Sequence, residues 1–300
     1  MSTRILTFDI EDWFHLLDCD ATRSPESWEG RESRVEAATD RILDELGQRG
    51  LKATFFCLGW IAERYPALIR RIDGAGHEIG THSFAHQLIY EQSWQEFDAD
   101  LRHSIQLLED ITGKPVRSYR APGFSLTPAT NWAIERLLEN GIEVDASIFP
   151  GERAHGGYAG LCRGPAWIQS PSGRLKELPL NLGRLAGRDI AFSGGGYFRL
   201  LPYPVIRAQL RRANYVMTYF HPRDFDAGQP VVQGISTIKR LKSYVGIRGA
   251  FRKLGAMLDD FSFVDMRSAV AAIDWAAAPV VSLMAATSER PLAPHHATTH

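Results

Sequence analysis

The first predicted strand and its end read Ile5-Leu6-Thr7-Phe8-Asp9-Ile10-Glu11-Asp12, an apolar run followed at once by three carboxylates. Short runs of this kind alternate along the chain with helical patterns, and such alternation is typical of β-α-β units and a parallel sheet. In parallel α/β sheets and barrels the functional groups lie at the carboxyl ends of the strands. We therefore expect an α/β protein whose site is built from the residues that follow its strands.

The remaining elements are predicted from the period of the apolar residues and from Gly and Pro stop signals. Strands are predicted at 53–58, 77–80, 116–119, 142–145, 176–180, 189–193 and 214–220, and helices at 35–46, 60–74, 92–111, 128–140, 204–213 and 266–277. Residues 151–176 are Gly-rich and irregular, and we expect a long loop or small insertion at the border of the site. Polar side chains follow the predicted strands at Asp9, Glu11, Asp12, His82, His86, Arg120, Asp145 and His221.

A single catalytic domain over residues 1–286 is expected, because 300 residues can bury one substantial core and single α/β barrels commonly reach this length. Residues 287–300 are polar and aperiodic, which predicts a disordered tail. Lys and Arg number 34 against 35 Asp and Glu, a formal net charge of −1 without a long run of either sign. This near-equality of positive and negative charge indicates neither a surface that binds nucleic acid nor one that binds an anionic membrane.

A cytoplasmic, soluble protein is expected. The three cysteines, Cys19, Cys57 and Cys162, are far apart and lack C-x-x-C spacing, which argues against a disulfide framework and against a cysteine zinc site. The acids that follow the first strand leave no room for the roughly 7–15-residue apolar segment of a signal peptide. No stretch approaches the roughly 18 apolar residues of a membrane span.

Two histidines stand four residues apart in Thr81-His82-Ser83-Phe84-Ala85-His86. A helical turn at this spacing places both imidazoles on one face, aimed at one ion, and imidazole suits zinc and its first-row neighbours. The alternative is that one histidine caps a helix and the other is an ordinary core or surface group. Their position at a strand end favours the metal site.

Three carboxylates, Asp9, Glu11 and Asp12, follow the first strand. Like charges this close need a cation, a proton or solvent to relieve their repulsion. If one carboxylate joins the two histidines, the result is a His₂-carboxylate site with an open position for water, the arrangement of hydrolytic zinc centres. The alternative is an acidic loop open to solvent.

Arg120 and His221 also stand at strand ends. A guanidinium can hold a neighbouring carboxylate ionised and correctly oriented, although an arginine that pairs with a surface acid is equally simple. A histidine with a pKa near ~6.5 can give a proton to a leaving amine at neutral pH. A lone histidine is more often structural, so this interpretation depends on the other residues.

Together, these segments resemble the polysaccharide deacetylases, the carbohydrate-esterase type 4-like family built on the NodB homology domain. Five motifs agree in order: an aspartate-bearing strand at 7–12, H-S-x-x-H at 82–86, R-A-P-G at 120–123, an aspartate motif at 145–147 and a histidine motif at 218–221. The resemblance covers about residues 4–224. Residues 9–15, 194–199 and 220–222 look closer still to a subgroup found with exopolysaccharide and O-antigen loci.

The resemblance implies a deformed (β/α) barrel of about seven parallel strands with loop insertions. It also implies one divalent metal ion, zinc first and cobalt, manganese or nickel as alternatives, and hydrolysis of an N-acetyl group from a hexosamine of a bacterial glycan or glycan precursor. The expected partner is therefore an N-acetylated saccharide.

Roles follow by resemblance for the residues that match the motifs. The family pattern assigns Asp9 as general base, His82 and His86 as metal ligands, Arg120 as the partner that tunes Asp9, His221 as general acid and Asp145 as a support for that acid. The usual T-F-D-D-G motif has adjacent aspartates, whereas Ile10 intervenes here and two acids follow. Glu11 is favoured as the third ligand and Asp12 remains open. The tryptophan that often follows the fourth motif is absent.

Further residues are expected to contact substrate. The turn after Arg120, at Pro122 and Gly123, is expected to offer a backbone N–H to the oxyanion of the tetrahedral intermediate. Three glycines precede Tyr197 and Arg199, which are expected to pack on a sugar ring and to bind a phosphate or carboxylate group, respectively. An ordinary glycine-rich turn is the alternative.

Two other functions fit the same residues. The scaffold also resembles cyclic-amide hydrolases of the allantoinase type, and a catalytically silent glycan-binding protein is the second alternative. The sequence leaves open the sugar, its linkage and carrier, the native metal and the oligomeric state.

Overall fold

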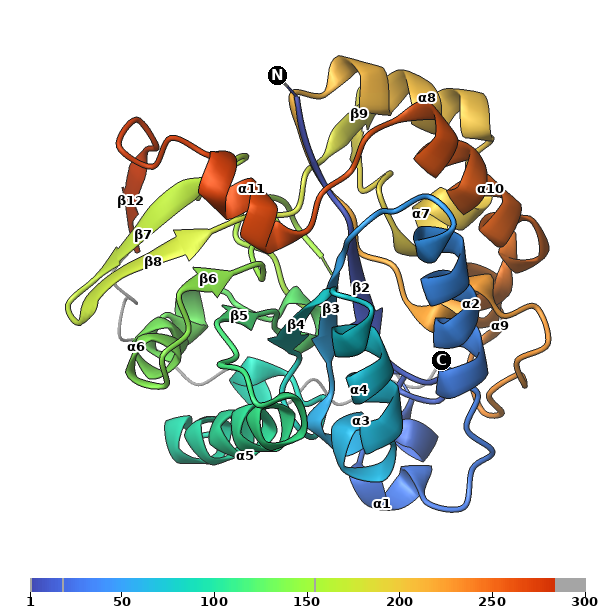
Figure 1. Ribbon diagram of the computed structural model, residues 1–300, viewed down its shortest axis with the longest axis horizontal. Coiled ribbons are helices and arrows are strands. Elements are labelled where there is room, and N and C mark those ends of the chain that lie inside the picture. Colours follow the sequence, from blue (N-terminus) through green and yellow to red (C-terminus); the bar gives the residue numbers. More distant parts are fainter. Residues whose placement is uncertain (1, 18, 154, 284–300) are drawn as a thin grey trace, which may run out of the picture.

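The computed structural model describes residues 2–17, 19–153 and 155–283, and its fold is an α/β barrel-like arrangement of a mostly parallel sheet covered by helices (Figure 1). The tail predicted at 287–300, and the domain boundary before it, lie outside the described residues. The expected α/β fold class is confirmed.

The central sheet has eight strands in the order β12-β7-β8-β6-β5-β4-β3-β2. Every neighbouring pair is parallel except β7 and β8, which form an antiparallel hairpin. This hairpin and β12 extend to the left in Figure 1. The strands are β2 (Thr7–Ile10), β3 (Thr54–Cys57), β4 (Glu78–Thr81), β5 (Ser118–Tyr119), β6 (Val144–Asp145), β7 (Ala166–Ser170), β8 (Gly173–Glu177) and β12 (Val280–Ser282).

Beyond β2, the last strand of this sheet, further parallel strand pairs partly close the barrel. β1 (Thr3–Ile5) pairs in parallel with β11 (Tyr215–Met217), and the pairing continues through a bridge between Phe8 and Phe220. A further parallel bridge joins Gly194 to Tyr219. The N-terminal strand therefore lies between β3 and the segment that leads to His221, which brings the ends of distant segments together.

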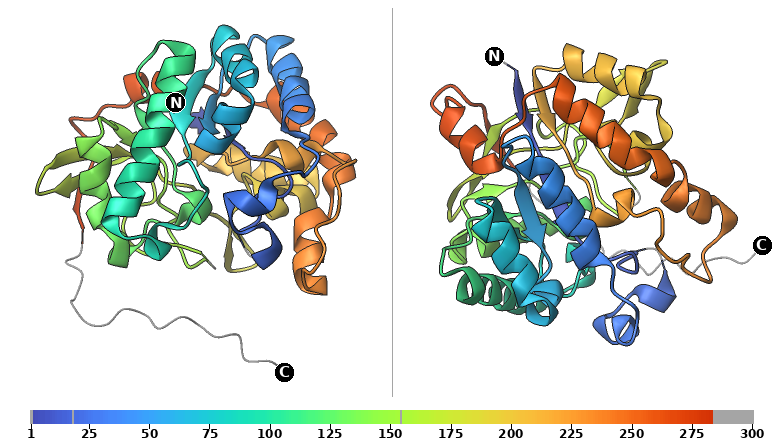
Figure 2. Two further views of the ribbon diagram at one scale, coloured as in Figure 1. Left: turned by 90° about the horizontal axis from the view of Figure 1, so that it is seen from below. Right: turned by 45° about the vertical axis from the view of Figure 1, so that its right-hand side comes forward.

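Helices cover the outside of this sheet, with α3 and α4 in front of β2–β4 in Figure 1; the views in Figure 2 show the same shell from below and from the side. The helices are α1 (Pro25–Trp28), α2 (Val35–Gly47), α3 (Gly59–Arg64), α4 (Pro66–Gly74), α5 (Trp94–Thr112), α6 (Trp132–Glu139), α7 (Gly195–Leu200), α8 (Tyr203–Arg212), α9 (Thr237–Tyr244), α10 (Ile247–Asp260) and α11 (Met266–Ala272). Short 3₁₀ turns are η1 (Asp20–Thr22), η2 (Ile89–Glu91), η3 (Pro122–Phe124), η4 (Pro128–Thr130) and η5 (Pro222–Phe225).

Three sequence predictions need correction. The helix predicted at 60–74 is two helices, because Pro66 lacks a backbone N–H and Tyr65 before it leaves the helical region at φ −127° and ψ 54°. The loop predicted at 151–176 contains β7 and most of β8, whose alternating buried residues were not recognised as a strand pattern. The strand predicted at 189–193 is instead β10 (Arg188–Ile190), which forms a small antiparallel hairpin with β9 (Gly183–Leu185).

Aromatic packing fixes the strands that carry the site. The ring of Phe8 stacks on Phe55 with centroids 5.1 Å apart and contacts Phe220 at 5.9 Å, and all three side chains are fully buried. Burial of one such side chain contributes about 1.5–3 kcal/mol, with a further ~0.5–1.5 kcal/mol for each aromatic pair. The neighbouring Asp9 and His221 thus project from a tightly packed part of the barrel.

Gly194 permits the close approach of its own backbone to that of Tyr219, where these two segments pair. A Cβ atom at this position would lie 2.1 Å from the carbonyl oxygen of Tyr219 and 2.5 Å from its ring, so no side chain fits without movement of the backbone. Gly249 in α10 offers the opposite case, since a Cβ there meets no atom within 4 Å.

We expect Gly194→Ala to lower the free energy of unfolding by about 1–3 kcal/mol, because the added methyl group forces two bridged segments apart. Gly249→Ala is the matched control and should be neutral or stabilising by up to about 1 kcal/mol in its helix. Urea unfolding of both variants measures the difference. Equal stability of Gly194→Ala and the unaltered protein would contradict the tight contact.

Candidate active site

The carboxyl ends of the strands deliver the predicted side chains to one place. Glu11 follows β2, His82 and His86 follow β4, and their ligand atoms lie within 4.8 Å of one another; the ligand atoms of Asp9, Glu11 and His221 form a second such group. All of these residues are at least 90% buried except His221, whose side chain is 20% exposed. The convergence predicted from the strand ends is therefore present.

Glu11, His82 and His86 have the donor arrangement of a metal site. Glu11 Oε1 lies 3.2 Å from His82 Nε2 and 3.1 Å from His86 Nε2. His82 Nδ1 lies 2.7 Å from the carbonyl oxygen of Arg120, which can only accept, so Nδ1 carries the proton and the lone pair of Nε2 faces the carboxylate. Two lone-pair atoms that face each other in a buried site need a cation or a proton between them, and this set of donor atoms fits a divalent metal ion.

The protonation of Glu11 agrees with this arrangement. Burial favours the neutral acid, but the rings of His86, His221 and His82 outweigh it and hold the pKa of the carboxyl well below its usual range. Glu11 is thus an anionic ligand at neutral pH.

The histidine motif is shaped by a tight loop and not by the helical turn that we predicted. Ser83 and His86 have positive φ angles of 65° and 53°. The carboxylate of Asp100, in α5, accepts the backbone N–H groups of Phe84 and Ala85 at 2.7 and 2.9 Å and pins the loop between the two ligands. Sequence reasoning missed Asp100, because no periodic pattern links a residue in the next helix to this loop.

Asp12 lies apart from the metal group, which corrects its prediction as an alternative ligand. Its carboxylate accepts N–H groups from Trp13 at 2.8 Å, Arg34 at 3.0 Å and Val35 at 3.3 Å, and a hydroxyl from Ser33. The N–H groups of Arg34 and Val35 lie at the start of α2 and have no acceptor within the helix, so Asp12 acts as a distant cap for that helix. Between the two candidates, the geometry favours Glu11.

Arg120 holds Asp9 in place. Its Nη1 donates to Asp9 Oδ1 at 2.7 Å and to Thr7 Oγ1 at 2.8 Å, and its Nε donates to the carbonyl of Ala146 at 3.2 Å. The guanidinium also lies 4.3 Å from the ring centroid of Phe56 and is completely buried. The second carboxylate oxygen of Asp9 is left facing His221 Nε2 at 3.8 Å.

His221 is oriented by Asp224, a residue that sequence reasoning did not single out. Its Nδ1 lies 3.0 Å from Asp224 Oδ2, and Asp224 Oδ1 lies 3.1 Å from Arg199 Nε. Burial favours ionisation of neither group, yet Arg199 and His221 lower the pKa of Asp224 to about 2. The carboxylates of Glu11, Asp224 and Asp9 offset burial and raise the pKa of His221 to about 9.

Asp145 does not contact His221, which corrects its predicted supporting role. Its Oδ1 accepts the hydroxyl of Ser147 at 2.5 Å, and its other neighbour is the fully buried Glu177 of β8. Burial first, and Asp145 second, raise the pKa of Glu177 well above its usual range, so that Glu177 keeps a proton and shares it with Asp145. The two acids form a structural pair across β6 and β8.

The four residues that were predicted to contact substrate lie in different environments. Arg199 is buried and donates to Asp224 and to the carbonyls of Gly195, Lys242 and Ser243, so it has no free donor fork for a glycan. Tyr197 is 45% exposed and lines a large cavity of about 980 Å³. Pro122 is buried and Gly123 is half-buried in η3, and neither belongs to the described lining of the cavity beside His221.

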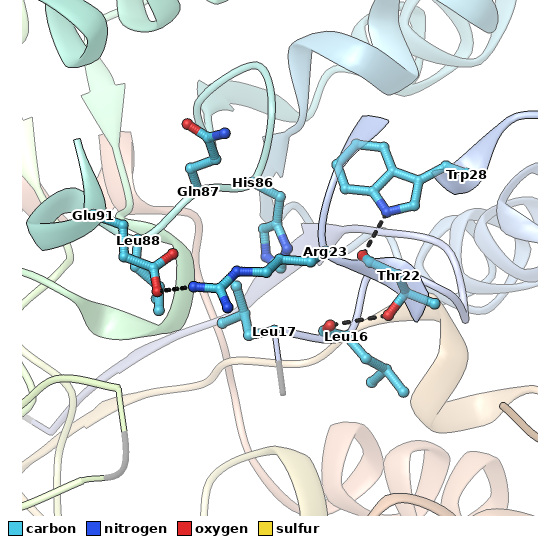
Figure 3. Close-up of a pocket in the computed structure, with 9 residues that line it drawn as sticks. All are labelled: Leu16, Leu17, Thr22, Arg23, Trp28, His86, Gln87, Leu88 and Glu91. Atoms are coloured by element: carbon cyan, nitrogen blue, oxygen red, sulfur yellow. Dashed lines mark hydrogen bonds and ion pairs between the residues drawn. The ribbon is translucent and has the colours of Figure 1, made fainter. Parts of the chain in front are cut away.

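Cavities adjoin the metal group on two sides. One of about 190 Å³ is lined by Glu11, His221 and Asp224 together with several basic residues. A smaller one of about 40 Å³ lies beside His86, whose ring stands at the centre of the residues in Figure 3, with the Arg23–Glu91 ion pair and Trp28 around it. Glu11 thus lines the cavity of about 190 Å³, and His86 lines the smaller one.

Among the helices that the structure describes, none combines the length and the apolar character needed to span a bilayer.

Two family models match the chain. Residues 5–141 match the polysaccharide deacetylase model, and residues 146–271 match a domain of unknown function, DUF3473. The first part of the chain is thus similar to the polysaccharide deacetylases, and the second part is similar to a domain of unknown function. The family resemblance is confirmed, and the subgroup remains a prediction.

Curated relatives agree over parts of their length. The peptidoglycan-N-acetylglucosamine deacetylase of Bacillus cereus is 34% identical over 99 residues, which cover 33% of this chain and 36% of the relative. The peptidoglycan deacetylase of Helicobacter pylori is 31% identical over 113 residues, 38% of each chain. The chitooligosaccharide deacetylase of Azorhizobium caulinodans is 32% identical over 87 residues, 29% of this chain and 41% of the relative. The matches span less than half of these relatives.

Two solved structures share the fold. A protein assigned as a polysaccharide deacetylase from Mycobacterium smegmatis matches with a TM-score of 0.61 and 22% identity over 96% of this chain and 93% of the other. The Puue allantoinase matches with a TM-score of 0.54 and 15% identity over 92% of this chain and 85% of the other. At these identities the likeness concerns the fold alone.

The metal content of two variants distinguishes which of the two acids that follow β2, Glu11 or Asp12, binds the metal. We expect Glu11→Gln to lose most of the bound metal, because a neutral amide replaces the anionic ligand. Asp12→Asn is the matched control: its amide oxygen still caps α2, so metal content should stay near that of the unaltered protein. Elemental analysis of purified protein after zinc loading gives the metal per chain. Loss of metal in Asp12→Asn alone would reverse the assignment.

Proposed function

We propose that this protein is a metal-dependent N-deacetylase that hydrolyses the acetamido group of an N-acetylhexosamine in a bacterial glycan or glycan precursor. One observation carries the proposal: Asp9 held by Arg120 and His221 held by Asp224 meet over the Glu11, His82 and His86 donor group. A base, an acid and a ligand set for one ion are the parts that amide hydrolysis needs.

The ligand set is proposed to hold one divalent cation, with zinc favoured because two imidazoles and one carboxylate suit it. A cation there would polarise the acetamide carbonyl and lower the pKa of a water molecule. The carbonyl of Arg120 fixes the ring of His82, so the site is preorganised before any ligand binds.

Asp9 is proposed as the general base. One carboxylate oxygen is held by Arg120 at 2.7 Å, which leaves the other free to accept a proton from the attacking water. Because the guanidinium is fully buried and always charged, it keeps Asp9 oriented toward the centre of the site.

His221 is proposed as the general acid. An amide nitrogen is too basic to leave as an anion, so it must receive a proton as the bond to the carbonyl carbon breaks. The pKa of His221 is raised to about 9, which keeps the imidazole protonated at neutral pH. Hydrolysis then yields acetate and a free amino sugar.

The finer assignments rest on sequence resemblance. Residues 9–15, 194–199 and 220–222 support a substrate from exopolysaccharide or O-antigen synthesis. The three described cysteines are free, which is compatible with the proposed cytoplasmic location. Since the sheet runs from β2 through β8, we propose one catalytic domain for the two family regions.

Acetate release tests the proposal. Protein stripped of metal and reconstituted with zinc, cobalt or manganese is given chitooligosaccharides, peptidoglycan fragments and allantoin. We expect metal-dependent acetate from an N-acetylated saccharide and a loss of more than about 100-fold in kcat/KM for His82→Ala and Asp9→Asn. Turnover of allantoin alone would favour the cyclic-amide hydrolase, and saccharide binding without any turnover would favour a glycan-binding protein.

The pH profile tests the pairing of His221 with Asp224. Asp224→Asn removes a carboxylate that raises the pKa of His221, so the protonated imidazole should be lost at a lower pH. We expect the alkaline limb of the kcat/KM profile to move down by about one pH unit or more. Asp226→Asn, which instead loses the partner of Arg34, is the control and should leave that limb in place. An unmoved limb in Asp224→Asn would remove His221 from the role of acid.

A further inference from the structure

The cavity beside His221 has an excess of fixed positive charge. Its walls of about 190 Å³ hold four basic side chains, Arg153, Arg199, Arg223 and Lys242, against two carboxylates, Glu11 and Asp224. Asp224 is already paired with Arg199 and His221, and Glu11 faces the two histidine ligands. The charges of the other three basic residues therefore have no matching anion in the cavity walls.

Arg223 shows this imbalance most clearly. Its Nη2 is buried and has no hydrogen-bond partner among the described residues, and the salt bridges of the described chain do not include it. Its guanidinium lies 6.0 Å from the ring centroid of Tyr244, a weak cation–π contact. A buried guanidinium nitrogen without an acceptor is costly, and a ligand atom that accepts its hydrogen bond would relieve that cost.

Arg153 and Lys242 stand at the border between this cavity and the larger one of about 980 Å³, because both line the two cavities. The walls of the larger cavity also hold two carboxylates, Glu152 and Asp189, of which Asp189 is paired with Arg163. The side chain of Arg153 lies over the rings of Phe124, Phe149 and Tyr219 at 4.9–5.4 Å and makes no ion pair with a described residue. Aromatic support of this kind holds a guanidinium in position. One donor of Arg153 goes to the side chain of Tyr219, and because the residue is exposed its other donors stay available.

Lys242 lies on α9, and contacts through Arg199 and Asp224 connect α9 with His221. Arg199 donates to the backbone carbonyls of Lys242 and Ser243 as well as to Asp224, which holds His221. The backbone at Lys242 is therefore fixed relative to the reacting centre, although its side chain is exposed.

We propose that the substrate carries an anionic group, a phosphate or a carboxylate, beside its acetylated sugar, and that Arg153, Lys242 and Arg223 bind it at the border of the two cavities. This inference rests on the proposed deacetylation. The acetamido group would enter the smaller cavity at His221, and the remainder of the saccharide or its carrier would extend along Tyr197 in the larger one.

A neutral substrate explains the cluster less well. Hydroxyl groups can accept hydrogen bonds from guanidinium and ammonium groups, but they leave three like charges uncompensated around one cavity. Arginine forks match the paired oxygens of phosphate and carboxylate, and such charge-assisted hydrogen bonds are roughly twice as strong as neutral ones.

Binding of product analogues to zinc-loaded protein tests the inference without turnover. Isothermal titration compares methyl glucosaminide with glucosamine 1-phosphate and with a glucosamine–glucuronate disaccharide. We expect at least one anionic ligand to bind about tenfold more tightly than the neutral one at low salt, and this advantage should shrink as ionic strength rises. The stronger of the two anions identifies the source of the charge.

Variants locate the binding residues. Arg153→Gln and Lys242→Gln should each weaken the anionic ligand by about five- to tenfold and leave the neutral ligand within about twofold. Arg240→Gln is the matched control, since Arg240 lies on the same helix α9 but lines neither cavity, and it should change neither affinity.

Equal affinity for neutral and anionic ligands, or equal losses in all three variants, would overturn the inference. Failure of the proposed function has a different signature, namely no acetate from any saccharide tested, neutral or anionic. Efficient deacetylation of neutral oligosaccharides by the unaltered protein, together with no preference of that protein for anionic ligands, would leave the deacetylase intact and remove only the anion site.

Discussion

The buried contact between Arg120 and Asp9 is the constraint on which the site depends. Both side chains are at most 3% exposed, so neither charge is solvated by water and each needs the other. Removal of one partner from such a pair costs about 3–5 kcal/mol. Arg120 also positions the set of candidate metal ligands, because its backbone carbonyl oxygen accepts a hydrogen bond from His82 Nδ1. Arg120, which follows β5, thus orients Asp9 through its side chain and His82 through its backbone.

The two family regions contribute different parts of this site. The polysaccharide deacetylase region, residues 5–141, supplies Asp9, Glu11, the two histidine ligands and Arg120. The region of unknown function, residues 146–271, supplies His221, together with the Asp224 and Arg199 that hold it. The bridge between Phe8 and Phe220 joins the two regions directly before Asp9 and His221. Each region therefore supplies one member of the proposed acid–base pair.

Much of this arrangement was predictable from the sequence, because parallel strands bring their carboxyl ends to one edge. Asp9, Glu11, His82, Arg120 and His221 all follow strands that apolar runs identify. What the sequence did not reveal lies in contacts between loops: the cap that Asp12 provides for α2, the pinning of the histidine loop by Asp100, and the burial of Arg199. Periodicity describes one element at a time, whereas these contacts are made only when the chain is folded.

Each carboxylate of the site has its own positive partner, and this separation explains how three acids can lie together in one buried space. Asp9 is paired with Arg120, Asp224 with Arg199, and Glu11 with the histidine ligands and the cation that they are built to hold. Because these partners are largely distinct, each acid has a positive group of its own to offset its burial. The Asp145–Glu177 pair shows the contrast: without a cation of its own, Glu177 retains a proton, and that pair takes no part in the acid–base arrangement.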